Sequence, residues 1–168
     1  MSLSMYEVSV PIFQQILGGL AGVIDKASAH FAARNIDAAN VVQMRLYPDM
    51  FTFARQVQSA SDHAKGATAR LAGVEPPSFP DTEANLEELK ARVAKTIDYL
   101  KTIKPEQFEG AETRKVVLTN RRGTMEFDGK SYLLKFALPN FYFHTTTAYD
   151  LLRSAGVEIG KRDFMGAR

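Results

Sequence analysis

Apolar residues recur at steps of three and four residues along most of this 168-residue chain. Such spacing places the apolar side chains on one face of an α-helix. It predicts helices at about residues 4–34, 47–72, 81–101 and 131–155. Each helix must bury its apolar face against the others. We therefore expect a mainly α protein, a four-helix bundle within one domain that spans residues 1–168.

Several residues mark where these helices begin and end. Ser4 and Glu7 have the spacing of a capping box at the start of the first helix. Asp81 or Thr82 would suit the start of the third helix, because short polar side chains accept hydrogen bonds from its first N–H groups. Gly73 is expected to end the second helix.

A rigid linker is expected between the second and third helices. Residues 73–81 contain three prolines, which restrict the backbone there. In the third helix that follows, one face carries charged residues that include Arg92 and Lys95. That face is expected to be solvated, because charged side chains rarely lie in a core.

The pattern changes between the third and fourth helices. At about residues 115–127, β-branched residues flank a four-residue link, 120–123, that ends with Gly123. This predicts a β-hairpin with Gly123 at a positive φ. A lone hairpin is marginally stable, so it should pack against the helices. After Gly156, the tail at 157–168 is expected to cover one end of the bundle or, preferably, to cross to a partner chain.

The charge and composition exclude several classes of protein. The 21 basic and 19 acidic residues are interleaved, which gives no basic stripe for nucleic acid. No apolar run approaches the roughly 18 residues of a membrane span. The chain has no cysteine, so disulfides and thiolate metal sites are excluded. Because no signal peptide is recognisable either, a cytoplasmic protein without membrane or nucleic-acid partners is expected.

Two helices place polar residues beside their apolar faces. On the second, Asp49, Gln56 and His63 are seven residues apart and project in nearly one direction. On the fourth, Asn140 and His144 share a face. Metal sites in bundles are built from such side chains on facing helices. Imidazole is a strong ligand for zinc or nickel, whereas an amide oxygen is a weak one. A buried histidine beside an amide is also an ordinary hydrogen-bonded pair, and this interpretation is preferred.

The end of the last helix carries a family resemblance. The motif LLRSAG at 151–156, with His144 nine residues before its arginine, resembles the corresponding segment of the DinB/YfiT-like superfamily. The blocks 45–75 and 138–164 are similar to a branch of uncharacterised bacterial proteins, carrying a domain of unknown function, within that superfamily. The similarity extends from about Met5 to Phe164.

This resemblance implies a four-helix bundle, often dimeric, that holds a divalent metal with three histidines. Members resemble thiol-dependent transferases, or act as metal-dependent hydrolases or isomerases. With LLRSAG setting the register, His144 occupies the position of one histidine, and Asn140 and Gln56 occupy the other two. In the alternative register, His144 takes the first position of the pair and Ala148 replaces the second. Either way, one strong ligand remains.

Three hypotheses follow. The first is a homodimeric bundle of unknown biochemical role, with a degenerate metal site at Gln56, Asn140 and His144, no expected cofactor and no metal catalysis. The alternative is an enzyme of the thiol-dependent transferase or hydrolase type, with zinc or nickel on His144, His63 and a carboxylate. The third is a module whose pocket binds a small molecule where the superfamily holds its metal.

Overall fold

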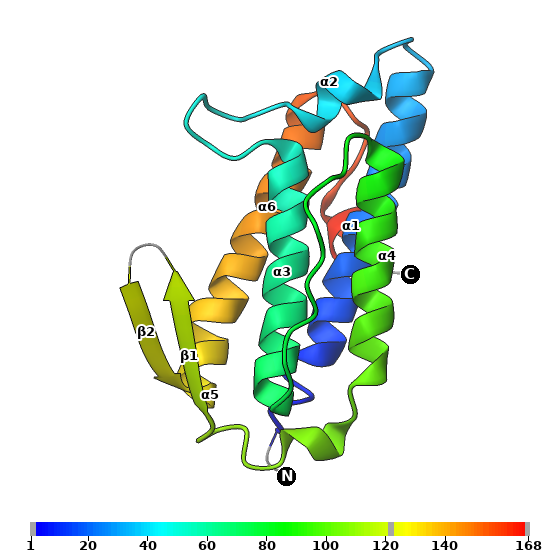
Figure 1. Ribbon diagram of the computed structural model, residues 1–168. Helices are drawn as coiled ribbons and strands as arrows, with labels where there is room; N and C mark the ends of the chain where they lie inside the picture. Colours follow the sequence, from blue (N-terminus) through cyan, green and yellow to red (C-terminus); the bar gives the residue numbers. More distant parts are fainter. Residues whose placement is uncertain (1–2, 121–122, 167–168) are drawn as a thin grey trace.

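The computed structural model describes residues 3–120 and 123–166 (Figure 1). Its four main helices are α1 (Val10–Ala32), α3 (Phe53–Ala72), α4 (Leu86–Thr102) and α6 (Leu138–Ser154). The smaller elements are α2 (Ala38–Val42), a 3₁₀ turn (Pro105–Phe108), strands β1 (Lys115–Asn120) and β2 (Gly123–Asp128), α5 (Gly129–Tyr132), a π-helical segment (Leu133–Ala137) and α7 (Lys161–Phe164). The mainly helical fold with a two-stranded hairpin is confirmed.

The four main helices form two parallel pairs. Figure 1 shows α1 and α6 running one way, and α3 and α4 running the other way. The linker 73–85 returns along the bundle between the end of α3 and the start of α4 (Figure 1). Its prolines keep the backbone of this segment extended, so the predicted rigid linker runs back along the bundle to the start of α4.

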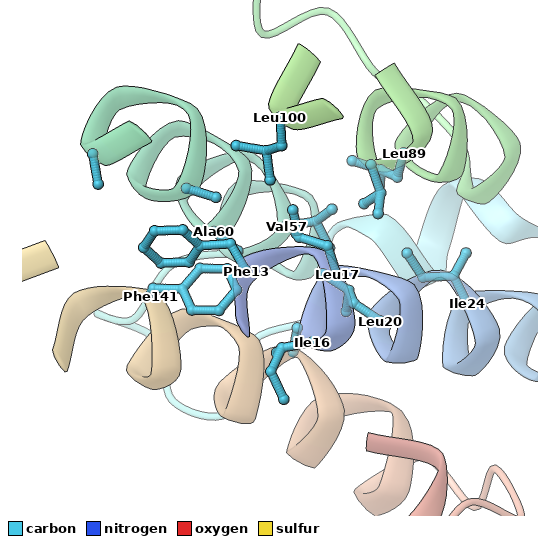
Figure 2. Packing of buried hydrophobic residues seen from close by; sticks show 14 of the residues in the cluster. Phe13, Ile16, Leu17, Leu20, Ile24, Val57, Ala60, Leu89, Leu100 and Phe141 are labelled. Carbon is cyan, nitrogen blue, oxygen red and sulfur yellow. The ribbon is translucent and has the colours of Figure 1, made fainter. Parts of the chain in front are cut away.

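The core lies where the four helices meet (Figure 2). Phe13 of α1 and Phe141 of α6 are fully buried and meet edge to face, with ring centroids 4.8 Å apart. Helix α3 contributes small buried residues such as Ala60 and Ala64, which allow its neighbours to approach closely. Helix α3 is therefore buried on most of its sides, and any polar residue on it lies against another element.

Three helices begin later than the periodicity predicted. Helix α1 begins at Val10, since residues 5–9 form turns, although Ser4 and Glu7 do make their reciprocal hydrogen bonds. Helix α3 begins after Thr52, whose hydroxyl accepts from the Arg55 N–H. Residues 47–52, which were expected to be helical, are irregular instead.

Helix α4 begins after Asn85 rather than at Asp81 or Thr82, because the Asn85 side chain accepts from the Glu88 N–H. The expectation that Arg92 of this helix is solvated is also wrong. Its side chain is buried at 2% exposure, not solvated, and it binds carboxylates of α3 and the linker. Gly73 does end α3, at φ 73°.

The fourth helix continues without a break from Gly129 to Ser154. Its middle, Leu133–Ala137, is π-helical and directly precedes Pro139. Proline has no N–H to offer the preceding turn, and the wider π turn accommodates that loss. Gly156 follows the helix at φ 89°.

The hairpin pairs Val116 with Phe127 and Leu118 with Met125. Val116 is buried, and Leu118 and Phe127 pack against the core, so these pairs form the inner face of the hairpin. Gly123 has the expected positive φ, of 129°. The rest of the predicted link, residues 121–122, lies outside the described residues.

In this single chain the described part of the tail packs against α1. Helix α7 lies on α1, where Lys26 and Asp163 form an ion pair of 2.6 Å. The rings of Tyr149 and Phe164 also meet, at 5.8 Å. Among the described residues, no helix is long and apolar enough to cross a membrane.

Candidate functional site

Gln56 of α3 and His144 of α6 meet inside the bundle. The Gln56 Oε1 and the His144 Nδ1 are 2.7 Å apart, and both residues are buried. An amide oxygen can only accept a hydrogen bond, so the His144 Nδ1 donates. This fixes the ring orientation and, in the neutral ring, makes the Nε2 atom the acceptor.

His63 lies two turns along α3 from Gln56 and faces the same histidine. The imidazoles of His63 and His144 are nearly parallel, with centroids 5.5 Å apart and an interplanar angle of 17°. The seven-residue spacing of Gln56 and His63 places both on the side of α3 that α6 covers. The structure thus brings together three of the sequence candidates: Gln56, His63 and His144.

Aromatic rings surround the two histidines. Phe51 stacks on His144 at 6.0 Å, and Phe143 meets the same ring edge to face at 5.3 Å. Phe136 of the π-helical segment lies 5.8 Å from His63. Phe51 and Phe143 are also exposed, at 47% and 56%, so they lie at the surface of this cluster.

Both imidazoles favour the neutral form. The pKa of His63 is lowered to about 4, chiefly by burial and also by the neighbouring His144 and Arg70, while Asp62 opposes these effects. Burial also lowers the pKa of His144, and the positive charge of Arg55 adds to this effect. At neutral pH the cluster therefore offers hydrogen-bonding nitrogens and no net imidazolium charge.

The other sequence candidates point elsewhere. The Asn140 Nδ2 donates to the Phe136 carbonyl of its own helix at 2.7 Å, rather than toward His144. Asp49 is exposed in the segment before α3. Asp62 forms ion pairs with Lys65 at 3.0 Å and with Arg92 at 2.9 Å.

These contacts do not fit the metal site that the resemblance to the superfamily implies. The His144 Nδ1 and the Gln56 Oε1 use each other as partners, and the Asn140 amide is bound to the backbone. Within the described residues, no group of three or more His, Cys, Asp or Glu side chains could hold a metal ion. A catalytic zinc site has three strong protein ligands, so the cluster lacks the donor set for one.

Sequence reasoning missed Phe51 and the importance of Phe136. Residues 47–52 were expected to be helical, and the irregular backbone there is what turns Phe51 onto His144. Nothing in the apolar spacing distinguishes Phe136 from the other aromatic residues of the chain. The proline three residues after Phe136 is the one signal that could have indicated the altered helix at this point.

Comparisons with known proteins agree with this fold. The sequence matches a family described as a domain of unknown function, DUF1993, over residues 5–165. The chain is also similar to the crystal structure of a DinB family member protein from Shewanella denitrificans, with a TM-score of 0.90 and 36% identity over 98% of this chain and 93% of that one. No curated protein matches the sequence.

Proposed function

Given that the chain belongs to the DUF1993 family and is built like a DinB family member, we propose that it binds a small molecule without using a metal. The binding groups are the neutral imidazoles of His63 and His144, at the position where the superfamily holds its metal. One observation carries the proposal: the hydrogen bond of 2.7 Å between the Gln56 Oε1 and the His144 Nδ1. An amide has taken the place of a ligand and oriented the ring instead.

The surroundings of the histidines support binding. Neutral imidazoles present a donor and an acceptor without the desolvation cost of a charge. The rings of Phe51, Phe143 and Phe136 give them apolar walls. Such a combination of apolar walls and a few fixed polar groups is typical of small-molecule sites.

The metal-dependent alternative has one observation in its favour. The two imidazoles are 5.5 Å apart and neutral, so both are able to bind a divalent ion. It would need a third strong ligand, and the carboxylate of Asp62, which acts electrostatically on His63, is already paired with Arg92 at 2.9 Å. The thiol-dependent transferase or hydrolase reading is therefore the second candidate.

Metal content distinguishes the two. We expect the protein, purified without chelator or immobilised nickel and offered zinc, nickel and manganese, to hold far less than one ion per chain. His144→Ala and His63→Ala should not lower that content relative to His30→Ala, which removes the histidine outside the cluster. Elemental analysis of the four proteins measures this. One ion per chain, lost in both cluster variants and kept in His30→Ala, would overturn the proposal in favour of the enzyme.

A homodimer and a cytoplasmic location also remain proposals. The exposed rings of Phe51 and Phe143 support the dimer, because a second copy would cover them. Sedimentation equilibrium of the same preparation measures the mass, and a monomer at every concentration would contradict it.

A further inference from the structure

A hollow of about 390 Å³ lies between the end of α3, the first residues of the linker and the start of β1. Figure 1 shows the last turn of α3 and the first residues of β1 at the same end of the bundle. This part of the hairpin is its base, where Lys115 pairs with Asp128, and its turn lies at the opposite end of the strands. The volume falls in the range of small-molecule sites.

Positive charge dominates the lining of this hollow. Arg70, Arg114 and Lys115 contribute cations, whereas Glu75 is the one carboxylate among the described lining residues. Lys115 pairs with Glu126 at 2.8 Å, but both side chains are more than half exposed, so this pair is weak. Within the described part of the chain, neither arginine forms an ion pair with a carboxylate. The lining therefore has a net charge of two positive units.

Backbone carbonyls hold Arg114 in place without cancelling its charge. Its Nη1 donates to the carbonyls of Leu71 and Gln107, and its Nη2 donates to that of Glu109 at 3.0 Å. The carbonyl of Leu71 belongs to the last turn of α3, where a cation is favoured by the helix dipole. A guanidinium has five N–H groups, so the Nε–H and one Nη2–H remain for a ligand.

Arg70 offers most of its guanidinium to the hollow. Its Nη1 donates to the hydroxyl of Tyr132 at 3.2 Å, and the tyrosine side chain is itself buried. The arginine lies back along α3 over Gly66, where a Cβ would be only 2.5 Å from its Nη1. Its other N–H groups can form the forked pair of hydrogen bonds that fits phosphate or carboxylate oxygens.

The charge of the lining favours one class of anion. A phosphate monoester carries about −1.5 to −2 charges at neutral pH, which matches the lining, whereas a carboxylate or a sulfate ester carries only one. Val74 and Val117 also line the hollow and are 40% and 46% exposed, so they offer apolar contacts to the organic part of such an ester.

We propose that this hollow binds a small phosphate monoester, with the phosphate on Arg70, Arg114 and Lys115 and the organic part against Val74 and Val117. None of the described residues that line the hollow belongs to the histidine site. The inference therefore goes beyond the proposed function and is independent of it.

Phenyl phosphate is the probe that tests this. Calorimetric titration at low ionic strength, at a pH well above the second phosphate pKa of about 6, should show saturable binding. Phenyl sulfate has the same shape and one charge fewer, so it should bind about fivefold or more weakly. Inorganic phosphate should also bind more weakly than phenyl phosphate, because it makes no contact with the two valines.

Arg70→Gln should weaken the binding of phenyl phosphate by about tenfold, because it removes a forked, charged donor. Lys115→Gln should weaken it by about threefold, and its exposed position makes it the variant to use if Arg70→Gln does not fold. Lys101→Gln is the matched control, because Lys101 is also an exposed lysine paired with a carboxylate, at 2.9 Å, but it lies on α4. This control should bind like the unmodified protein.

Three results would overturn the inference. The first is the absence of saturable binding of phenyl phosphate. The second is equal affinity for phenyl sulfate or for inorganic phosphate, since the ligand would then not be recognised as a phosphate monoester. The third is an equal loss in Lys115→Gln and Lys101→Gln, which would show that phenyl phosphate responds only to the overall charge of the protein.

Discussion

The side chains of His63 and His144 show how burial and local partners decide the chemistry of single residues. Burial is the main reason that both have a lowered pKa, and for His63 the value falls to about 4. Gln56 then orients His144 through an uncharged hydrogen bond of 2.7 Å. The pair is thus adapted to polar contacts at neutral pH and resists protonation.

This predicts a stability that depends on pH. The unfolded chain takes up a proton at His63 near its ordinary pKa of 6.5, but the folded chain does so only near pH 4. The unfolded state therefore binds more protons in this window, and the free energy of unfolding falls as the pH is lowered through it. His63 alone should account for a loss of about 3 kcal/mol.

Urea unfolding across this pH window measures the effect. His63→Leu should flatten the dependence, and His30→Ala serves as the control that removes a histidine outside the cluster. A dependence as steep in His63→Leu as in the unmodified protein would mean that His63 is protonated in the folded state.

Which residues meet at the site was partly predictable. The spacing of seven residues places Gln56 and His63 on one side of α3, and helical geometry follows directly from sequence. The orientation of Asn140 was not predictable, because a carbonyl in the irregular turn before Pro139 competes for its amide. Local backbone geometry decided that contact, and periodicity carries no information about it.

At the scale of elements, the ends of helices were easier to predict than their starts. Gly73 and Gly156 end α3 and α6 at positive φ, where glycine is favoured over other residues. The start of a helix depends on which of several polar residues caps it. Thr52 caps α3 and Asn85 caps α4, in place of polar residues earlier in the sequence. Asp81 was not available as a cap because it forms ion pairs with Arg55 and Arg92.

The packing of the tail on α1 can be tested at Gly19. A Cβ at Gly19 would overlap the Phe164 carbonyl oxygen and lie 2.9 Å from that of Asp163. Gly19→Ala should therefore displace the tail and destabilise the protein by about 1–3 kcal/mol. Limited proteolysis of the tail, together with urea unfolding, measures this.

Gly18 and Gly22 provide matched controls on the same helix, because a Cβ at either meets nothing within 4 Å. Gly18→Ala and Gly22→Ala should stabilise the protein by about 0.5–1 kcal/mol, since alanine favours helix. If Gly19→Ala behaved as these two do, the tail would not be packed on α1.

At the scale of the whole molecule, parallel packing of α3 and α4 requires the linker to return along the bundle. The three prolines indicated that this linker is rigid, but nothing in the periodicity showed its path. Arg92 fixes that path. Its guanidinium binds Asp62 of α3 at 2.9 Å, and it also binds Asp81 at 3.0 Å and Glu83 at 2.9 Å in the linker.

Removal of this guanidinium should weaken the whole bundle. Arg92→Met leaves Glu83, whose side chain is only 12% exposed, without its cation, and removes the ion pairs by which α4 binds the linker and Asp62 of α3. The expected loss is about 3 kcal/mol, because breaking a buried ion pair strands the remaining charge. Urea unfolding measures the loss, and hydrogen exchange in the linker shows whether its path opens.

Lys101→Met is the control on the same helix. Lys101 pairs with Asp98 at 2.9 Å, but both side chains are more than half exposed, at 63% and 71%. An exposed pair contributes at most about 1 kcal/mol, so this variant should remain close to the unmodified protein. Equal losses in the two variants would show that Arg92 is not needed to hold the linker in position. A large loss confined to Arg92→Met would show that one buried cation joins α3, the linker and α4 into a single cooperative unit, against which α6 presents His144.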